Sequence, residues 1–267
     1  MFTIARRALK DKKIFLLSFV LGGIGMAWMY AALFPTIGKL SESYSEIIKS
    51  FPEAFLKAFG IDEGLFTGFE SYMSTEHFGF VWPIMLIFLI ASFAGTAVSR
   101  EIEKGTIEIL LALPISRVKI FFGKYLSGIA ALCIFVVFSV LAIIPMAEAH
   151  NIDYDVSHFL TMSLLGLIFG WAILGLSMFF SAIFSDKSRV YMATGGIMIV
   201  MYVIRIVSIL SDKFDKLKYF SFFHYYNAPN ALAKNSIAPE TFIVFISVAV
   251  ITTILAAVWF SKRDAAV

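Results

Sequence analysis

Three groups of residues in this 267-residue sequence have types and spacings that chemistry could use. The first is Gly175–Met178, which fits the loose Gly-x-Ser-x pattern of intramembrane serine proteases with Ser177 as the nucleophile. A serine nucleophile requires a general base within hydrogen-bonding distance. The sequence argues against a protease, because its histidines fall in loops or at the edges of apolar segments: His77, His150, His158 and His224.

A second group lies in one short polar loop and combines side chains that a metal site would need: His150, Asp153, Asp155 and His158. Their spacing matches no usual zinc pattern, and the sequence has no His-Glu-x-x-His motif. A solvated acidic loop is therefore the favoured interpretation, and a metal transporter is the weaker alternative. A six-span channel is a further alternative, although the sequence contains no filter-like repeat.

The third group is the polar segment Ser99–Lys124, which we call the elbow. Thr106 can cap a short helix, Pro114 should end that helix, and Ser116 can cap the next one. A rigid elbow of this kind could transmit movement from a soluble partner to two membrane spans. Its candidate contact residues are Arg100, Glu101, Glu103, Gly105, Thr106, Glu108, Pro114, Ser116 and Arg117.

Individual residues of the elbow allow two interpretations. Glu101 and Glu103 could contact a partner, or they could hold the elbow in place through Lys104 and Arg100. Gly105 is expected to serve the turn rather than a ligand. Arg117 lies near a helix N-terminus, where its charge opposes the helix dipole, and this favours a partner contact.

The elements that position these residues are predicted to be membrane helices. Apolar residues make up 60% of the chain and charged residues 15%, against about 45–50% and about 25% in soluble domains. The mean hydropathy is +0.86. A spanning helix needs about 20 apolar residues. Six segments qualify and predict one all-α membrane domain over residues 1–267: Ile14–Phe34, Phe78–Val98, Tyr125–Met146, Phe159–Phe184, Val190–Leu210 and Phe242–Phe260.

The distribution of charge predicts the orientation of these spans. If the N-terminus is cytoplasmic, the cytoplasmic segments carry twice as many Lys and Arg residues as the outer loops. This bias is the usual one for proteins of the cell membrane. We therefore expect both termini in the cytoplasm. The weak point is the loop Ser211–Thr241, which places Lys213, Lys216 and Lys218 on the outer side.

Several features outside the elbow also carry expectations. Ser41–Ala58 has the spacing of an amphipathic helix on the outer surface. The aromatic run Tyr219–Asn227 is typical of an interfacial belt, with a re-entrant segment as the alternative. Arg205 is the charge within a predicted span, which suggests the translocation path or a dimer seam unless its side chain reaches the interface. Gly166 and Gly170, and likewise Gly195 and Gly196, predict close helix packing.

The elbow resembles the loop between the second and third spans of ABC-2 type permeases, which are membrane subunits of ATP-binding-cassette transporters. The resemblance is carried by Arg100–Glu108, then Leu110–Arg117, then Gly123-Lys124. The basic amphipathic N-terminal stretch, the six spans and the aromatic run agree with it. The resemblance therefore extends over essentially the whole chain, although Lys104 between Glu103 and Gly105 departs slightly from the family's commonest pattern.

The resemblance implies a half-transporter that pairs with a second, identical or different, permease subunit. It implies that the elbow is a coupling helix seated on a separate ATPase subunit and that the N-terminal stretch is a connecting helix beside it. Members mostly export drugs, peptides, lipids or polysaccharides. The chain has no phosphate-binding loop, and Gly123–Tyr125 is only a fragment of one, so ATP and Mg²⁺ are expected in the partner and no cofactor here. Basic residues adjoin the membrane segments, which argues against nucleic-acid binding.

Overall fold

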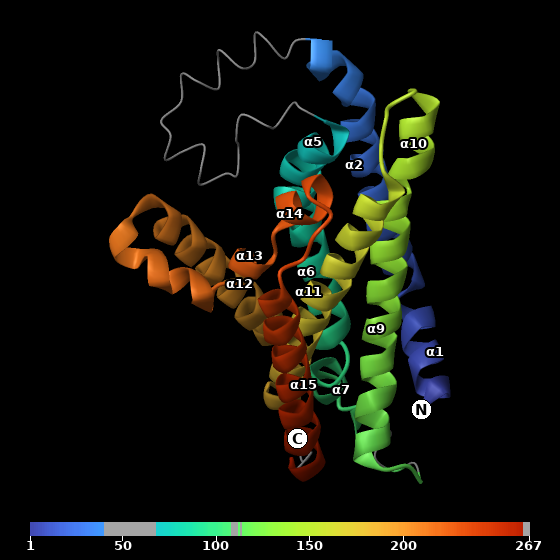
Figure 1. Ribbon diagram of the computed structural model, residues 1–267. Helices are drawn as coiled ribbons and strands as arrows, with labels where there is room; N and C mark the ends of the chain where they lie inside the picture. Colours follow the sequence, from blue (N-terminus) through green and yellow to red (C-terminus); the bar gives the residue numbers. More distant parts are fainter. Residues whose placement is uncertain (40–67, 108–111, 113, 264–267) are drawn as a thin grey trace.

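The computed structural model describes residues 1–39, 68–107, 112 and 114–263, and every regular element among them is a helix. The all-α fold predicted from the sequence is therefore confirmed. The elements, drawn in Figure 1, are α1 (Phe2–Asp11), α2 (Lys13–Lys39), α5 (Phe69–Glu76), the π-helix η1 (His77–Val81), α6 (Trp82–Gly95), α7 (Ser99–Glu103), α9 (Arg117–Leu141), α10 (Ile143–Ala149), α11 (Val156–Ile183), α12 (Lys187–Leu210), the 3-10 helix η2 (Asp212–Phe220), α13 (Phe222–Tyr225), α14 (Ala228–Ala233) and α15 (Pro239–Lys262).

Six helical segments are long and apolar enough to cross a bilayer, and each contains most of one predicted span. The hydropathy of a segment thus identified every span correctly, because about 30 Å of hydrocarbon requires about 20 apolar residues at about 1.5 Å per residue. The segments are Lys13–Ile37, Phe69–Gly95, Arg117–Ala149, Val156–Ile183, Lys187–Leu210 and Pro239–Lys262.

The second span begins earlier than the sequence predicted. Helix starts at Phe69 rather than Phe78, so residues assigned to the outer loop belong to the span. The reason is packing, because Phe69, Tyr72 and Met73 are buried although polar residues separate them. The predicted amphipathic helix Ser41–Ala58 lies outside the described residues.

Helix α11 occupies the centre of the bundle, and α15 packs along it more extensively than any other described pair of helices. Glycines permit the close approach. A Cβ atom on Gly175 would lie 2.8 Å from the carbonyl oxygen of Ala249, and one on Gly166 would lie 2.5 Å from the Trp82 ring. Gly170 similarly faces Leu132. Close packing was therefore predicted correctly for Gly166 and Gly170.

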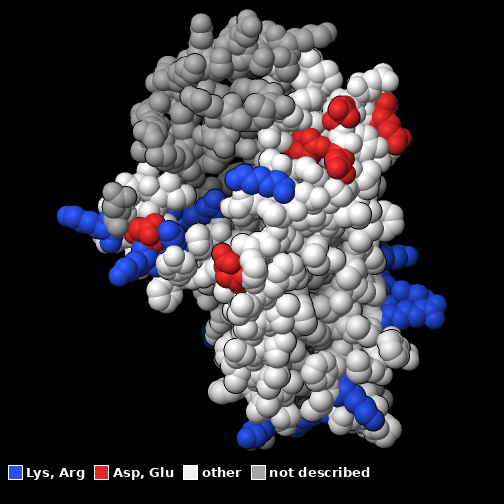
Figure 2. Space-filling model, in the orientation of Figure 1, with Lys and Arg blue, Asp and Glu red and all other residues white. Residues whose placement is uncertain are grey.

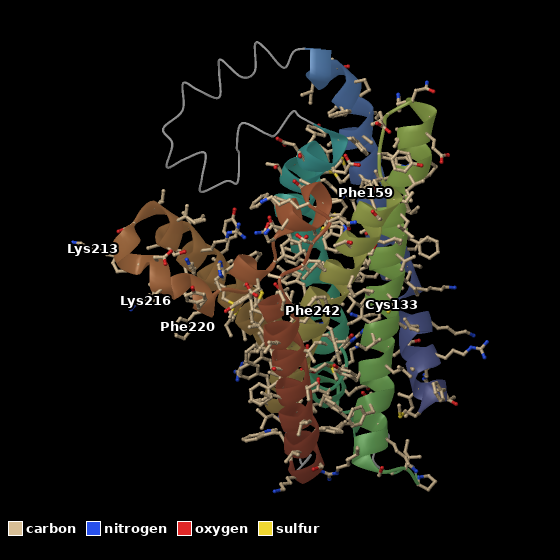
Figure 3. The ribbon with its side chains drawn as sticks, in the orientation of Figure 1. Cys133, Phe159, Lys213, Lys216, Phe220 and Phe242 are labelled. Carbon is tan, nitrogen blue, oxygen red and sulfur yellow. The ribbon has the colours of Figure 1, made fainter. Side chains whose placement is uncertain are left out.

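For Gly195 and Gly196 of α12, the predicted close packing has no counterpart among the described residues of this chain. A Cβ atom at either position would meet no heavy atom within 4 Å among the described residues. Helix α12 is the least buried of the six spans, and its outer part leaves the bundle together with η2 (Figure 1). We call this feature the projecting arm. Figure 3 shows Lys213 and Lys216 at its tip.

The aromatic run after the projecting arm folds back into the bundle. Phe222, Phe223 and Tyr226 are buried, and the Tyr226 hydroxyl donates to the carbonyl oxygen of Phe78 at 3.0 Å. The rings of Tyr226 and Phe169 have centroids 4.5 Å apart. The rings of these three residues therefore pack on protein, and the choice between an interfacial belt and a re-entrant segment stays a prediction.

Both ends of the chain lie at the same end of the bundle, where the N and C marks stand in Figure 1. We call it the terminal end. Figure 2 shows Lys and Arg side chains around this end and beside α1, whereas acidic side chains gather at the opposite end, around α10. The elbow also lies at the terminal end, because α7 follows the lower end of α6 and leads back to α9.

Candidate functional site

The first side of the elbow is anchored to the end of α11. The Ser181 hydroxyl accepts the backbone N–H groups of Val98 at 3.2 Å and Ser99 at 3.3 Å. The two serine hydroxyl oxygens lie 3.0 Å apart, and both side chains are fully buried. A buried backbone N–H without a partner is costly, so this serine pair fixes where the chain turns out of the second span.

The acidic residues of the elbow hold it to neighbouring helices. Glu101 accepts hydrogen bonds from the Lys124 ammonium at 2.7 Å and from the Thr106 hydroxyl at 2.5 Å. Burial alone would raise the pKa of Glu101, but these hydrogen bonds and the charges of Lys124 and Arg100 hold it below its ordinary value. The Glu103 carboxylate lies 3.9 Å from the Lys187 ammonium. The ion-pair partners are thus Lys124 and Lys187.

These ion pairs correct the partners expected from the sequence, which were Lys104 and Arg100. Lys104 and Arg100 were expected because they adjoin the two glutamates in the sequence. The observed partners instead come from the N-terminal parts of α9 and α12. The carboxylates therefore join three helices at the terminal end of the bundle. Burial makes the Glu101 pair the stronger of the two, because the exposed Glu103 pair is screened by solvent.

The turn after α7 presents an exposed tip, Glu103–Gly105. Gly105 has φ +67°, a left-handed conformation that side chains with a Cβ atom adopt at a cost. No heavy atom among the described residues lies within 4 Å of the position its Cβ would take. Gly105 therefore serves the turn, as the sequence indicated, and the described residues leave the space above it open.

The second side of the elbow is tied to the C-terminal end of α15. Ser116 caps α9 as predicted, because its hydroxyl accepts the Lys119 N–H at 3.3 Å. Arg117 donates to the carbonyl oxygen of Arg263. Arg263 in turn donates to the carbonyl oxygen of Ala182 at 2.7 Å and to the Ser185 hydroxyl at 2.5 Å. Pro114 is exposed just before this clamp, and Glu108 lies outside the described residues.

Helix α1 lies beside the elbow and packs on α9. A Cβ atom on Gly123 would lie 2.9 Å from Cβ of Ile4, so only glycine allows this approach. Ala5 is buried in the same contact, while Arg6 and Arg7 are exposed. The basic amphipathic helix predicted for the N-terminus is present, and its apolar face contacts protein.

A lateral groove opens between α2, α6 and α12, and Phe223 completes its wall. Its volume of about 620 Å³ falls within the range of about 300–1,000 Å³ found for small-molecule sites. The lining is almost entirely apolar. Phe88 and Ile199 on its rim are 64% and 66% exposed, so the groove opens sideways from the bundle. Ser92 lies at the terminal end of the groove.

The guanidinium of Arg205 has a hydrogen-bond acceptor within the protein. It donates to the carbonyl oxygen of Phe223, and it thereby holds α13, whose Phe223 forms part of the groove wall. The side chain is half-buried and bonds to protein. The structure gives Arg205 this positioning contact, and the expected role in a path or seam stays a prediction.

The residues of the two enzyme-like motifs make structural contacts. Ser177 is fully buried and accepts a hydrogen bond from the Thr194 hydroxyl at 3.2 Å. Asp155 caps α11 by accepting the Ser157 N–H at 2.8 Å, and His158 contacts the carbonyl oxygen of Leu232. Within the part of the chain that the structure describes, no three His, Cys, Asp or Glu residues form a group that could hold a metal ion.

Comparison with known protein families shows to which family the chain belongs. The family model for the ABC-2 family transporter protein matches residues 5–265, which is nearly the whole chain. The chain belongs to the ABC-2 transporter family. A comparison with curated proteins found no match. Membership in the ABC-2 family, together with the six apolar helices, makes this protein a multi-pass membrane permease subunit. Permeases of this family are generally non-catalytic.

Sequence reasoning missed the long-range partners of the elbow. Neither Ser181 nor Arg263 belongs to the motif, and each lies more than 80 residues from the elbow residue it holds. The only available signals were a serine at the end of an apolar segment and a basic residue after the last span. Neither signal distinguishes a residue that holds the elbow in place from an ordinary polar residue at the end of a helix.

Proposed function

We propose that this ABC-2 permease docks a separate ATPase subunit on the tip Glu103–Gly105 of its elbow. The observation that carries the proposal is the clamping of both sides of the elbow. Ser181 holds one side and Arg263 holds the other, while the tip itself stays exposed. A rigid lever with a free tip is suited to convey force, because displacement of the tip must move the spans to which its sides are bound.

The proposal includes a division of labour between chains. ATP and Mg²⁺ bind to the ATPase subunit, and two permease subunits, identical or different, form the translocation path. Permeases of this family normally work with an ATPase subunit and are often dimeric. The cargo is an amphipathic or apolar compound, such as a drug, peptide or lipid, and it is exported. The apolar lining of the lateral groove supports a cargo of this class.

The proposed location is the cell membrane with the terminal end in the cytoplasm. The concentration of Lys and Arg around the terminal end supports this orientation, since positive residues favour the cytoplasmic side (Figure 2). The elbow would then face the compartment that contains ATP.

The docking proposal is tested by substitutions at Gly105. The permease is purified from membranes together with its ATPase, and the ATP hydrolysis that accompanies it is measured. Gly105→Trp places a bulky ring in the open space above the tip, and we expect about a tenfold loss of bound ATPase, equivalent to about 1.4 kcal/mol. Gly105→Ala is the matched control, because alanine strains the positive-φ turn as tryptophan does but adds no bulky ring, and it should retain the ATPase.

Two results would contradict the docking proposal. One is full retention of the ATPase by Gly105→Trp. The other is an equal loss with Gly105→Ala, which would trace the effect to the turn itself rather than to a covered surface. Glu101→Arg is a weaker probe, because it also removes the buried ion pair with Lys124.

A further inference from the structure

The second span changes its helical form at the π-helix η1. The N–H of Trp82 donates to the carbonyl oxygen of His77, five residues earlier, instead of to that of Phe78, four residues earlier. A π-turn of this kind holds one residue more than an α-helical turn, and π-turns are rare and often lie at functional sites. The next residue is Pro83, which has no N–H to donate. The helix therefore leaves the Phe78 carbonyl without its usual donor.

Tyr226, in the turn between α13 and α14, supplies the missing donor. Its hydroxyl donates to the carbonyl oxygen of Phe78 at 3.0 Å, although 148 positions separate the two residues in the sequence. Both residues are buried, so water does not reach this carbonyl in place of the hydroxyl. A buried carbonyl without a donor is costly. This single hydrogen bond therefore stabilises the π form of the second span.

The side chain that suits the π form least is His77. It is fully buried, and neither ring nitrogen has a hydrogen-bond partner among the described residues. Its neighbours are aromatic, since its ring centroid lies 5.6 Å from that of Tyr30 and 4.8 Å from that of Phe78. A polar ring buried without partners destabilises the conformation that buries it. The π form thus carries a cost that the Tyr226 hydrogen bond offsets.

The two sides of the π-turn are held differently. On the side toward the terminal end, the Trp82 indole N–H donates to the Ser139 hydroxyl of α9 at 2.8 Å, and the indole ring lies against Gly166 of α11. On the opposite side, α5 packs against α14 (Figure 1). If the Trp82 N–H returned to Phe78, the turn would lose its extra residue and α5 would rotate by about 100° relative to α6. That rotation would break the packing of α5 on α14.

We propose that Tyr226 is a latch between two states of the permease. In the latched state its hydroxyl bonds the Phe78 carbonyl, the second span is π-helical and α5 packs on α14. In the released state the segment Phe222–Ala233 withdraws, Trp82 donates to Phe78, and α5 turns. The two movements occur together, because narrowing of the turn carries the Phe78 carbonyl away from Tyr226. This device goes beyond the proposed docking of an ATPase and does not depend on it.

The test is hydrogen–deuterium exchange of the purified permease in detergent, read by mass spectrometry. Tyr226→Phe removes the hydroxyl but keeps the ring, whose centroid lies 4.5 Å from that of Phe169. We expect amide exchange to become about tenfold faster in two segments at once, Phe69–Val81 and Phe222–Ala233. Loss of one buried hydrogen bond shifts an equilibrium between two states by about this factor, and exchange follows the population of the released state.

Two further variants bracket this result. Tyr225→Phe is the matched control, because the Tyr225 hydroxyl donates to the carbonyl oxygen of Tyr219 at 3.3 Å, and exchange of Phe69–Val81 should not change. An equal effect of this control on that segment would overturn the latch. His77→Leu replaces the unpaired imidazole by an apolar side chain of similar size, so it should favour the latched state and slow exchange of both segments. Faster exchange of both segments in His77→Leu would contradict the proposal.

Pro83→Ala tests whether Tyr226 replaces the missing backbone donor. Alanine restores an N–H five residues after Phe78, which can then bond the Phe78 carbonyl without the latch. Tyr226→Phe should therefore have no further effect on exchange in the Pro83→Ala background, and it should fold there even if it does not fold alone. The proposal is overturned if Tyr226→Phe accelerates exchange equally in both backgrounds, if it fails to fold in both, or if it affects Phe222–Ala233 alone. Since no ATPase is present, these failures leave the docking proposal standing.

Discussion

At the scale of single residues, Lys12 is the side chain whose surroundings depart furthest from those of an ordinary surface lysine. Burial and three neighbouring cations bring its pKa from 10.5 to about 7. The nearby carboxylates of Glu101 and Glu103 are engaged by other lysines. The charge of Lys12 therefore changes near neutral pH.

The first prediction concerns that pH dependence. The folded protein loses the Lys12 proton as pH rises through about 7, whereas the unfolded chain keeps it up to about pH 10.5. Stability should therefore rise with pH over this range, because the unfolded state binds more protons. The unfolding temperature in detergent, measured at about pH 7 and about pH 9, should show this increase.

Lys12→Arg supplies the control for that prediction. A guanidinium remains charged throughout the range, so the unfolding temperature should lose this pH dependence. If the dependence persists in Lys12→Arg, another group causes it.

The sequence could predict the residues of the elbow but not their partners. Ser116 acts through the neighbouring backbone, and its capping contact could be anticipated from local chemistry. The contacts of Ser99 with Ser181 and of Arg117 with Arg263 join residues that lie far apart in the sequence. Nothing in local spacing encodes such pairs, because they depend on how the spans pack.

At the scale of helices, the sequence likewise predicted the elements but not how they pack. Hydropathy located all six spans, since membrane thickness sets their length. It could not place the start of the second span, where burial of Phe69 and Tyr72 extends the helix through polar sequence. It also could not distinguish glycines that pack closely, such as Gly166, from glycines in open space, such as Gly196.

The second prediction uses these two glycines. Gly166→Val brings a side chain within 2.5 Å of the buried Trp82 ring, and overpacking of this kind costs about 1–3 kcal/mol. The unfolding temperature in detergent should fall measurably. Gly196→Val adds the same side chain to another span where nothing lies within 4 Å, and its unfolding temperature should stay near that of the parent. Equal temperatures for the two variants would contradict the packing of α11 on α6.

At the scale of the whole molecule, charge distinguishes the two ends of the bundle. Basic side chains surround the terminal end and acidic ones the opposite end (Figure 2). Exposed Lys234 after α14 and the lysines of the projecting arm are exceptions, and Lys218 of the arm is paired with Asp215 at 2.8 Å. The overall bias predicts that the elbow is cytoplasmic and that the loop after α14 is external.

The third prediction tests this topology with cysteine labelling. Cys133 is the only cysteine in the sequence, so Cys133→Ala gives a background without thiols. Lys104→Cys at the elbow tip and Lys234→Cys after α14 replace two exposed lysines at opposite ends. A membrane-impermeant maleimide applied to intact cells should label the Lys234→Cys protein and spare the Lys104→Cys protein until the cells are opened. The reverse pattern would invert the orientation.

The pairing of α11 with α15 has a consequence for biogenesis. The chain is synthesised from its N-terminus, so α11 enters the membrane while the helix that covers much of its surface has not yet left the ribosome. Until then Gly175 lacks its contact with Ala249, and Arg117 of the elbow has no carbonyl oxygen at residue 263 to bind. The elbow thus reaches its final form only after α15 and Arg263 have been synthesised and packed.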